Sequence, residues 1–173
     1  SKSEARDLVT AADVASERLL VERLRDAFPD HAIEAEEEVQ DPADERPRWF
    51  LDPLDGTVNF VHGLPAFGIS MGLVDASGPA VAALVFPKLG ETFLAVRGGG
   101  ATLNGTPIRV SSTPDLGRAV IATGFPYQRD SLVNPNLDNF NRFVLRVRGI
   151  RRMGSAALDL AYVAAGRLDA YWE

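Results

Sequence analysis

Apolar residues near the start of the chain recur at the spacing of a helix. Three of them lie four positions apart and share one helix face: Leu20, Leu24 and Phe28. Thr10 and Asp13 have the spacing of a capping box, in which each side chain accepts a hydrogen bond from the backbone N–H of the other residue. The pattern therefore predicts an amphipathic helix over residues 11–28, with Pro29 and Asp30 ending it.

Beyond this helix the pattern changes to short apolar runs and alternating residues, which are typical of strands. Five segments are expected to be strands: Trp49–Leu51, Phe67–Val74, Val81–Phe86, Glu91–Val96 and Arg118–Thr123. Asp52 and Pro53 should end the first of them. Asn104 and Gly105 favour a type I′ hairpin turn. The three runs between Phe67 and Val96, with turn residues between them, predict a run of antiparallel strands.

Helical spacing returns in the last third of the chain. Helices are expected over Leu137–Val147 and Ala156–Ala165, with Gly166 capping the second. Helices around an antiparallel sheet give an α+β fold class. The length of 173 residues suggests one domain, or a domain and a fragment, with a sizeable core.

Composition narrows the class of protein. Hydrophobic residues at 46% and charged residues at 24% exclude a disordered or collagenous chain. With no cysteine, the chain has no disulfide framework and no thiolate zinc site, and with two histidines a multi-histidine metal site is not expected. No apolar run approaches the roughly 20 residues that span a bilayer, and no leader opens the chain, so a soluble protein of a reducing compartment is expected.

The net charge of −6 is unevenly distributed. Residues 1–60 hold 16 acidic and 7 basic side chains, whereas residues 61–173 hold 8 acidic and 11 basic ones. Such asymmetry indicates either solvated faces of different sign or a cation site.

Two acidic residues, Asp52 and Asp55, follow the predicted buried strand and lie three positions apart. Carboxylate oxygens, completed by a backbone carbonyl or water, are the ligands that Mg²⁺ prefers. The N–H groups of Gly56 and Thr57 could hold a phosphate beside such an ion. Asp-Pro and Asp-Gly are also ordinary turn dipeptides, so both interpretations stay open.

A second anomaly is basic. Five arginines lie between Asp138 and Asp159 without an acidic residue among them: Arg142, Arg146, Arg148, Arg151 and Arg152. A solvated edge is the simpler interpretation, because no aromatic platform accompanies them. A nucleic-acid or partner surface is the alternative.

The segment Asp52–Phe60, with the sequence DPLDGTVNF, resembles the signature of the inositol monophosphatase family of Mg²⁺-dependent, lithium-sensitive phosphatases. Three other segments resemble elements of the same family in the same order: Asp7–Asp13, Ala35–Glu37 and Gly149–Glu173. The resemblance implies a layered α/β/α/β/α sandwich, of which this chain is mainly the N-terminal half with its helices and antiparallel sheet. It implies a metal-binding domain over residues 1–145 and the start of a substrate-binding α/β domain over residues 146–173, continued beyond Glu173 by a Trp-Asp motif.

The resemblance also implies a metal site with two to three Mg²⁺ ions. Glu36, Asp52 and the backbone carbonyl of Leu54 would hold the first ion. Asp52 would bridge to a second ion, which Asp55 also binds, and Glu36 would face a third, looser site. Thr57 and Asp13 would orient and deprotonate the attacking water, and Glu36 is counted with them among the catalytic residues.

Residues that would contact the substrate are implied in the same way: Asp55, Gly56, Thr57, Gly154, Ser155, Ala156 and Glu173. The amides of Gly56 and Thr57 would bind the phosphate. Glu173 would accept hydrogen bonds from ring hydroxyl groups.

The implied activity is that of a hydrolase, an inositol-phosphate phosphatase that converts myo-inositol 1-phosphate to inositol and phosphate with metal-activated water. The implied protein is a cytoplasmic homodimer without membrane contact. One alternative is a sister phosphatase acting on histidinol phosphate, fructose 1,6-bisphosphate or a 3′-phosphoadenosine nucleotide. Another is an RNA- or RNA-polymerase-associated regulator of the extragenic suppressor type, and a third is that the segment is inactive alone.

Overall fold

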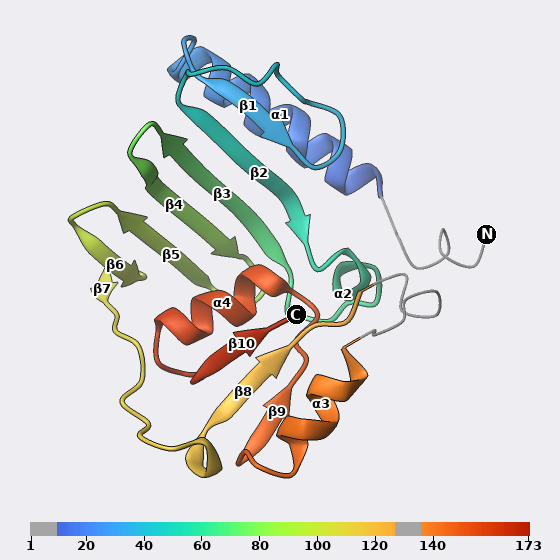
Figure 1. Cartoon of the computed structure of the whole chain (residues 1–173). Helices are drawn as coiled ribbons and strands as arrows, with labels where there is room; N and C mark the ends of the chain where they lie inside the picture. Colours follow the sequence, from blue (N-terminus) through green and yellow to red (C-terminus); the bar gives the residue numbers. More distant parts are fainter. Residues whose placement is uncertain (1–9, 127–135) are drawn as a thin grey trace. The chain divides into compact units, whose positions relative to one another are not determined.

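The computed structural model describes residues 10–126 and 136–173 (Figure 1). The chain forms two compact units, one of residues 9–107 and a second that includes residues 108–173. The sequence-based boundary between residues 145 and 146 lies within the second unit, and it stays a prediction about the domains of the whole protein.

The first predicted helix is present as α1 (Ala11–Ala27). Both hydrogen bonds of the capping box form, with Thr10 as the N-cap and Asp13 as its partner. The residues buried on the helix are Asp13, Glu17 and Val21, again at intervals of four. The predicted apolar face lies at the edge of this buried line, and Phe28 at its end is 41% exposed. The most buried line of α1 is therefore largely polar.

Residues 9–107 contain a seven-stranded sheet whose spatial order follows the sequence. Its strands are β1 (Ala32–Ala35), β2 (Arg48–Asp55), β3 (Gly68–Asp75), β4 (Gly78–Phe86), β5 (Glu91–Val96), β6 (Gly100–Leu103) and β7 (Thr106–Pro107). All neighbouring pairs are antiparallel except β1 and β2, which are parallel. Asn104 and Gly105 have φ angles of 49° and 78°, the positive values that a type I′ turn requires.

The core of this unit lies between α1 and the first strands of the sheet (Figure 1). Its buried members come from α1, β1 and β2: Val21, Ile33, Ala35, Trp49 and Leu51. Strand β1 was not predicted from the sequence. It is four residues long and pairs in parallel with β2, so its register depends on a partner far along the chain.

Strand β2 continues through Asp52 and Pro53 to Asp55, so the prediction that these two residues end the strand was wrong. Asp52 lies opposite Ser70 of β3, and Asp55 lies opposite Gly68. Three steps along β2 therefore match two steps along β3, which is a β-bulge with one extra residue. Pro53 has no N–H to donate to the ladder, and a bulge tolerates that loss. A short helix, α2 (Thr57–Val61), follows the strand.

The second unit contains a three-stranded parallel sheet in the order β10-β8-β9. Its elements are a 3₁₀ turn (Leu116–Arg118), β8 (Val120–Thr123), α3 (Leu137–Val144), β9 (Gly149–Arg151), α4 (Ala156–Ala164) and β10 (Ala170–Trp172). Both predicted helices are present, although α3 ends at Val144, three residues before its predicted end, and Gly166 follows the C-cap of α4 with a φ of 70°. The two short strands β9 and β10 were not predicted. The mixture of helices with a largely antiparallel sheet confirms the α+β fold class. None of the helices in the described residues is long and apolar enough to cross a membrane.

Candidate metal and catalytic site

Two carboxyl groups meet where β1 ends beside β2. Glu36 directly follows β1, and its N–H donates to the carbonyl oxygen of Leu51 at 3.1 Å, which holds Glu36 next to β2. The carboxyl groups of Glu36 and Asp52 share a hydrogen bond. The structure thus brings together two of the predicted metal ligands, which are separated by sixteen positions in the sequence.

The β-bulge in β2 explains how Asp55 can serve the same site. Side chains three positions apart in a regular strand point to opposite faces of the sheet. Burial alternates from Arg48 to Asp52, but Pro53 and Leu54 are buried in succession, so the alternation shifts by one residue. Asp52 and Asp55 are consequently both half-buried and close enough for the charge of Asp55 to act on Asp52.

Crowding of like charges perturbs Asp52. Burial raises the pKa of its carboxyl group to about 8 from the ordinary value of 3.8, with the neighbouring Glu36 and Asp55 adding to the rise. The N–H of Leu54, which donates to Asp52 Oδ1 at 3.0 Å, opposes the shift but does not cancel it. A cation bound at this point would reverse the effect and keep the carboxylates ionised.

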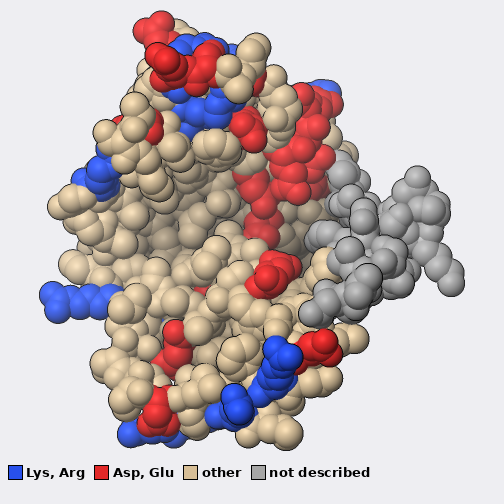
Figure 2. Space-filling model, viewed as in Figure 1, with Lys and Arg blue, Asp and Glu red and all other residues tan. Residues whose placement is uncertain are grey.

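An open groove of about 470 Å³ gives access to this pair of carboxyl groups. Glu36 and Asp52 contribute to its lining, along with Phe50 and Ser70 from the same face of the sheet. On the face shown in Figure 2, acidic side chains gather over the region where Figure 1 places the loop after β1 and the end of β2. An ion in solution can therefore reach Glu36 and Asp52.

The described residues fit a cation that takes two carboxylates from this chain. Within residues 10–126 and 136–173, no group of three acidic or histidine side chains is arranged to enclose an ion. The predicted sites do not need such a group, because one uses Glu36 with Asp52 and the other uses Asp52 with Asp55. A carbonyl oxygen, which has two lone pairs, and water can complete the coordination of a hard ion.

Gly56 and Thr57 form the turn from β2 into α2. Gly56 is the N-cap with a φ of 86°, a left-handed conformation that glycine adopts without steric cost, and no described side chain caps the helix. The hydroxyl oxygen Oγ1 of Thr57 lies 3.1 Å from Asp13 Oδ1 and 3.0 Å from the carbonyl oxygen of Leu54. One hydroxyl hydrogen can serve only one of these acceptors at a time. Thr57 therefore connects a predicted catalytic acid with a predicted metal-binding carbonyl.

The two carboxyl oxygens of Asp13 have separate partners. Oδ2 accepts hydrogen bonds from the N–H of Thr10, at 2.9 Å, and from the Thr10 hydroxyl, whereas Oδ1 faces Thr57. Asp13 is 1% exposed. The capping function and the predicted catalytic function thus use different atoms of one side chain.

Glu17, one turn along α1 from Asp13, was not singled out from the sequence. It is 1% exposed, and its carboxyl group accepts hydrogen bonds from three consecutive backbone N–H groups just after Glu36. Ser16 beside it donates to the carbonyl oxygen of Pro53 at 3.0 Å. The spacing of Asp13, Glu17 and Val21 was the available signal, but acidic residues on a helix are ordinarily interpreted as solvated.

The predicted substrate residues of residues 108–173 are described within their own unit. Ser155 is the buried N-cap of α4, and its Oγ accepts the N–H of Leu158 at 3.2 Å. Gly154 before it has a φ of 84°, and Ala156 is the exposed first residue of the helix. Glu173 accepts a hydrogen bond from the hydroxyl group of Tyr171. Their participation in one site with Glu36 and Asp52 stays a prediction.

Comparison with known proteins identifies the family of this chain. Residues 1–173 match the profile of the inositol monophosphatase family. A Nus factor SuhB of Pseudomonas aeruginosa is 45% identical and aligns with 100% of this chain and 66% of its own length. The solved structure of an inositol monophosphatase from Anabaena superposes with a TM-score of 0.91 at 45% identity, over 95% of this chain and 66% of the other.

A third relative is the crystal structure of an IMPase/NADP phosphatase complexed with Mg²⁺ and phosphate. It has a TM-score of 0.82 at 26% identity, over 95% of this chain and 60% of the other. The chain thus spans about two thirds of the length of the relatives that it matches. The match of the family profile over all 173 residues assigns the chain to the inositol monophosphatase family.

Proposed function

We propose that the protein containing this chain is a Mg²⁺-dependent phosphomonoesterase that hydrolyses inositol monophosphate to inositol and phosphate. The observation that carries the proposal is the half-buried Asp52, which shares a hydrogen bond with Glu36 and lies within reach of the charge of Asp55. Acidic groups crowded in this way are unfavourable unless a proton or a cation joins them. A relative that bears the name of a phosphatase was crystallised with Mg²⁺ and phosphate, which makes Mg²⁺ the first cation to test.

Glu36, Asp52 and the carbonyl of Leu54 would hold one ion, and Asp52 with Asp55 would hold a second. Glu36 would also face the third ion. When bound, Mg²⁺ supplies positive charge that stabilises the phosphoryl group in the transition state and acidifies bound water. The carboxyl groups of Glu36 and Asp55 lie close enough to Asp52 to act on its carboxyl group, and the N–H of Leu54 donates to it.

Thr57 and Asp13 would act on the attacking water. The Thr57 oxygen has lone pairs that can accept a hydrogen bond from water while its own hydrogen points to Asp13 Oδ1, 3.1 Å away. Asp13 would receive the proton that leaves the water by way of Thr57. Positioning and proton removal of this kind accelerate a reaction by about 10²- to 10⁴-fold.

The proposed substrate contacts are those that the family resemblance implies. The N–H groups of Gly56 and Thr57 would bind the phosphate, because the first N–H groups of a helix have no partner within it. By the same resemblance, the alcohol part of the substrate would contact Asp55, Gly154, Ser155, Ala156 and Glu173. We further propose a homodimer in the cytoplasm, on the strength of the family resemblance.

Phosphate release from a panel of substrates tests the proposal. The purified protein should release phosphate from myo-inositol 1-phosphate with Mg²⁺, and EDTA should abolish the release. Histidinol phosphate, fructose 1,6-bisphosphate and a 3′-phosphoadenosine nucleotide, assayed side by side, distinguish the sister phosphatases. Activity that is indifferent to EDTA, or absent on every phosphomonoester, contradicts the proposal.

A second candidate function, association with RNA or RNA polymerase, is favoured by one surface of the second unit. Five arginines on or beside α3 and β9 are exposed: Arg142, Arg146, Arg148, Arg151 and Arg152. A relative with 45% identity bears the name Nus factor SuhB. Exposed guanidinium groups at this density suit contacts to phosphates of a nucleic-acid backbone.

Charge reversal tests this second function. The paired substitutions Arg142→Glu and Arg146→Glu should abolish salt-dependent RNA binding, whereas Arg23→Glu, on the exposed side of α1, should leave it unchanged. RNA binding that is undetectable in the unaltered protein, or that survives both substitutions, excludes this surface. Phosphatase activity with normal kinetics in the doubly substituted protein would separate the two functions.

A further inference from the structure

The buried carboxyl group of Glu17 is saturated with donors from one short stretch of chain. Its Oε2 accepts the N–H of Glu37 at 2.8 Å, and its Oε1 accepts the N–H groups of Glu38 at 2.8 Å and Val39 at 2.9 Å. These three residues come immediately after Glu36. We infer that Glu17 is a positioning residue, which fixes the turn after β1 so that the side chain of Glu36 reaches Asp52 and the metal. The inference rests on the proposed function, because it concerns the metal of that site.

The geometry of the turn gives Glu17 this control. The N–H of Ala35 donates to the carbonyl oxygen of Val39 at 2.7 Å, so the chain reverses within four residues. Three consecutive N–H groups that converge on one acceptor leave the turn little conformational freedom. Glu36 is itself exposed, and its backbone N–H is bonded to Leu51. The position of its side chain is therefore set by the turn on one side and by β2 on the other.

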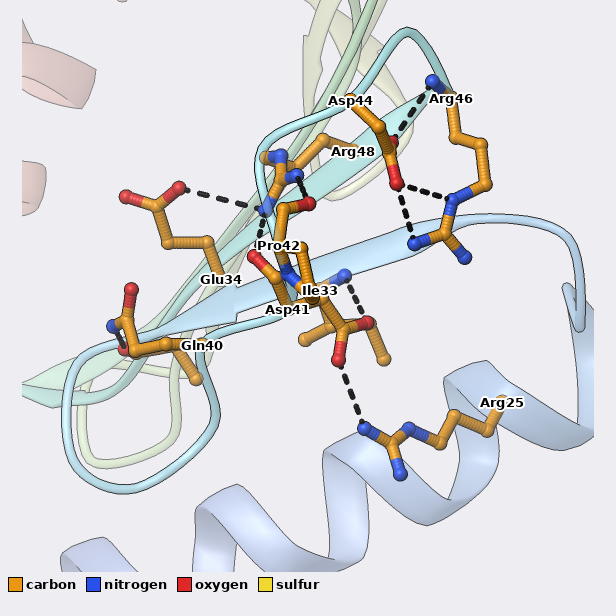
Figure 3. Close-up of polar contacts among 10 residues, drawn as sticks. Arg25, Ile33, Glu34, Gln40, Asp41, Pro42, Asp44, Arg46 and Arg48 are labelled. Atoms are coloured by element: carbon orange, nitrogen blue, oxygen red, sulfur yellow. Dashed lines mark hydrogen bonds and ion pairs between the residues drawn. The ribbon is translucent and has the colours of Figure 1, made fainter.

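The return of the chain toward β2 is anchored separately (Figure 3). Asp41 Oδ2 accepts the N–H of Ile33 at 2.9 Å, and Asp41 Oδ1 accepts from Arg25 at 3.2 Å. Arg48 donates to the carbonyl oxygens of Asp41 and Pro42 at 2.9 and 2.5 Å. These contacts hold Asp41 and Pro42, which lie several residues after Glu36 in the chain. Loss of Glu17 should thus loosen the turn beside Glu36 without releasing the whole loop.

Glu17 also fixes where this turn lies relative to the segments that carry Asp52 and Thr57. On the same helix, Asp13 contacts Thr57, and Ser16 donates to the carbonyl oxygen of Pro53 between Asp52 and Leu54. One stretch of α1 therefore bonds to all three segments that carry predicted ligands or catalytic groups. Glu17 is the member of this set whose partners precede β2, and so it sets the distance between the Glu36 turn and the β-bulge.

The substitution Glu17→Gln tests the inference with little change in volume. The glutamine amide nitrogen cannot accept a hydrogen bond, so at least one of the three N–H groups loses its partner. In the whole protein, we expect the dissociation constant for Mg²⁺ to rise by about 10- to 100-fold, the effect typical of residues that orient metal ligands. Hydrogen exchange at the amides of residues 37–39 should accelerate. Glu17→Ala should enlarge both effects, and Glu17→Gln carries the test if the alanine variant does not fold.

Glu22→Gln is the matched control, because Glu22 lies on the same helix with its side chain exposed. It should alter neither Mg²⁺ binding nor exchange. Unchanged Mg²⁺ affinity in folded Glu17→Gln overturns the inference, since a merely structural residue would lower the melting temperature and leave the affinity of the folded protein as it was. Failure of the unaltered, folded protein to bind Mg²⁺ is a different outcome, which refutes the proposed function before any variant is compared.

Discussion

Two pairs of carboxyl groups in residues 9–107 are similar in composition and opposite in surroundings. Asp13 and Glu17 on α1 are fully buried, and each accepts hydrogen bonds from three N–H or O–H donors. The second pair is Asp52 and Glu36: Asp52 accepts the N–H of Leu54, but its carboxyl group shares a hydrogen bond with that of Glu36 and is also acted on by the charge of Asp55. The first pair is satisfied by the protein, and the second pair gains from a bound cation. Burial and the supply of donors thus change together: the fully buried acids have N–H or O–H donors for their oxygens, whereas the half-buried Asp52 and the exposed Glu36 face each other.

Removing the charge at Asp52 should have the largest effect. Asp52→Asn leaves the shape of the side chain intact but removes a ligand shared by two predicted ions. We expect phosphatase activity to fall by about 10³-fold, since metal stabilisation of the transition state is worth several kcal/mol. Steady-state kinetics at several Mg²⁺ concentrations measure the loss. Asp75→Asn, at a half-buried acid that pairs with Arg97, is the control and should retain activity. Equal activity in both variants would refute the assignment of Asp52 as a ligand.

The stability of the metal-free protein should depend on pH through Asp52. Its carboxyl group has a pKa of about 8 when folded, against 3.8 ordinarily, so between these values the folded state binds more protons than the unfolded state. The free energy of unfolding should therefore decrease as the pH rises from about 4 to about 8, by at most about 1.4 kcal/mol per pH unit.

Urea unfolding at a series of pH values measures this dependence. Saturating Mg²⁺ should remove the decline, because the cation stabilises the ionised carboxylate in the folded state alone. Asp52→Asn should flatten the same slope without metal. A metal-free protein whose stability rises steadily over this range would contradict the unfavourable crowding around Asp52.

A smaller effect is expected from the hydroxyl group that lies between Asp13 and the carbonyl oxygen of Leu54. Thr57→Val keeps the shape of the side chain but removes the hydroxyl group that faces Asp13 and Leu54. Activity should fall by about 10²-fold, the lower end of the range for losing proton transfer, while Mg²⁺ affinity stays the same. Thr106→Val, at an exposed position in β7, is the control. A large loss of Mg²⁺ affinity in Thr57→Val would assign Thr57 to the metal site instead.

The smallest effect should come from the exposed ion pair between α1 and the loop after β1. Arg18 lies beside Glu17 in sequence and pairs with Glu38 at 3.2 Å, but both side chains are largely exposed. Arg18→Ala should change the free energy of unfolding by less than about 1 kcal/mol and leave Mg²⁺ binding unchanged. Thermal unfolding and a Mg²⁺ titration check this. A defect as large as that of Glu17→Gln would mean that the buried acid does not position the turn by itself.

The sequence predicted those elements whose signals are local. The capping box of Thr10 and Asp13, the Asn104–Gly105 turn and the run of Glu91–Val96 all formed as expected, because each depends on neighbouring residues. Strand β1 was not predicted because its four residues, which include Glu34, show too little alternation of apolar and polar side chains. Its parallel pairing with β2 stabilises it instead. Pro53 was interpreted as the end of a strand because its sequence does not reveal the bulge that accommodates it.

The residues of the candidate site also differ in whether a local sequence pattern reveals them. The spacing of Asp52 and Asp55 was visible as a short motif, and resemblance to a family added Glu36 and Asp13. No local pattern marks Glu17, since its partners lie twenty to twenty-two positions away and are backbone N–H groups that any sequence supplies. An acidic side chain that is bound by backbone N–H groups cannot be recognised from the residue types of its partners.

One carboxyl oxygen of Asp13 caps the start of helix α1, and the other faces Thr57 in the candidate site. Helix ends fray, and when the first turn opens, the carboxyl group that anchors it leaves its place opposite Thr57. Warming should therefore reduce turnover through the opening of a single helical turn, at temperatures where the sheet is still intact. On the proposed function, thermal loss of activity would begin at the start of one helix and precede the melting of the whole molecule.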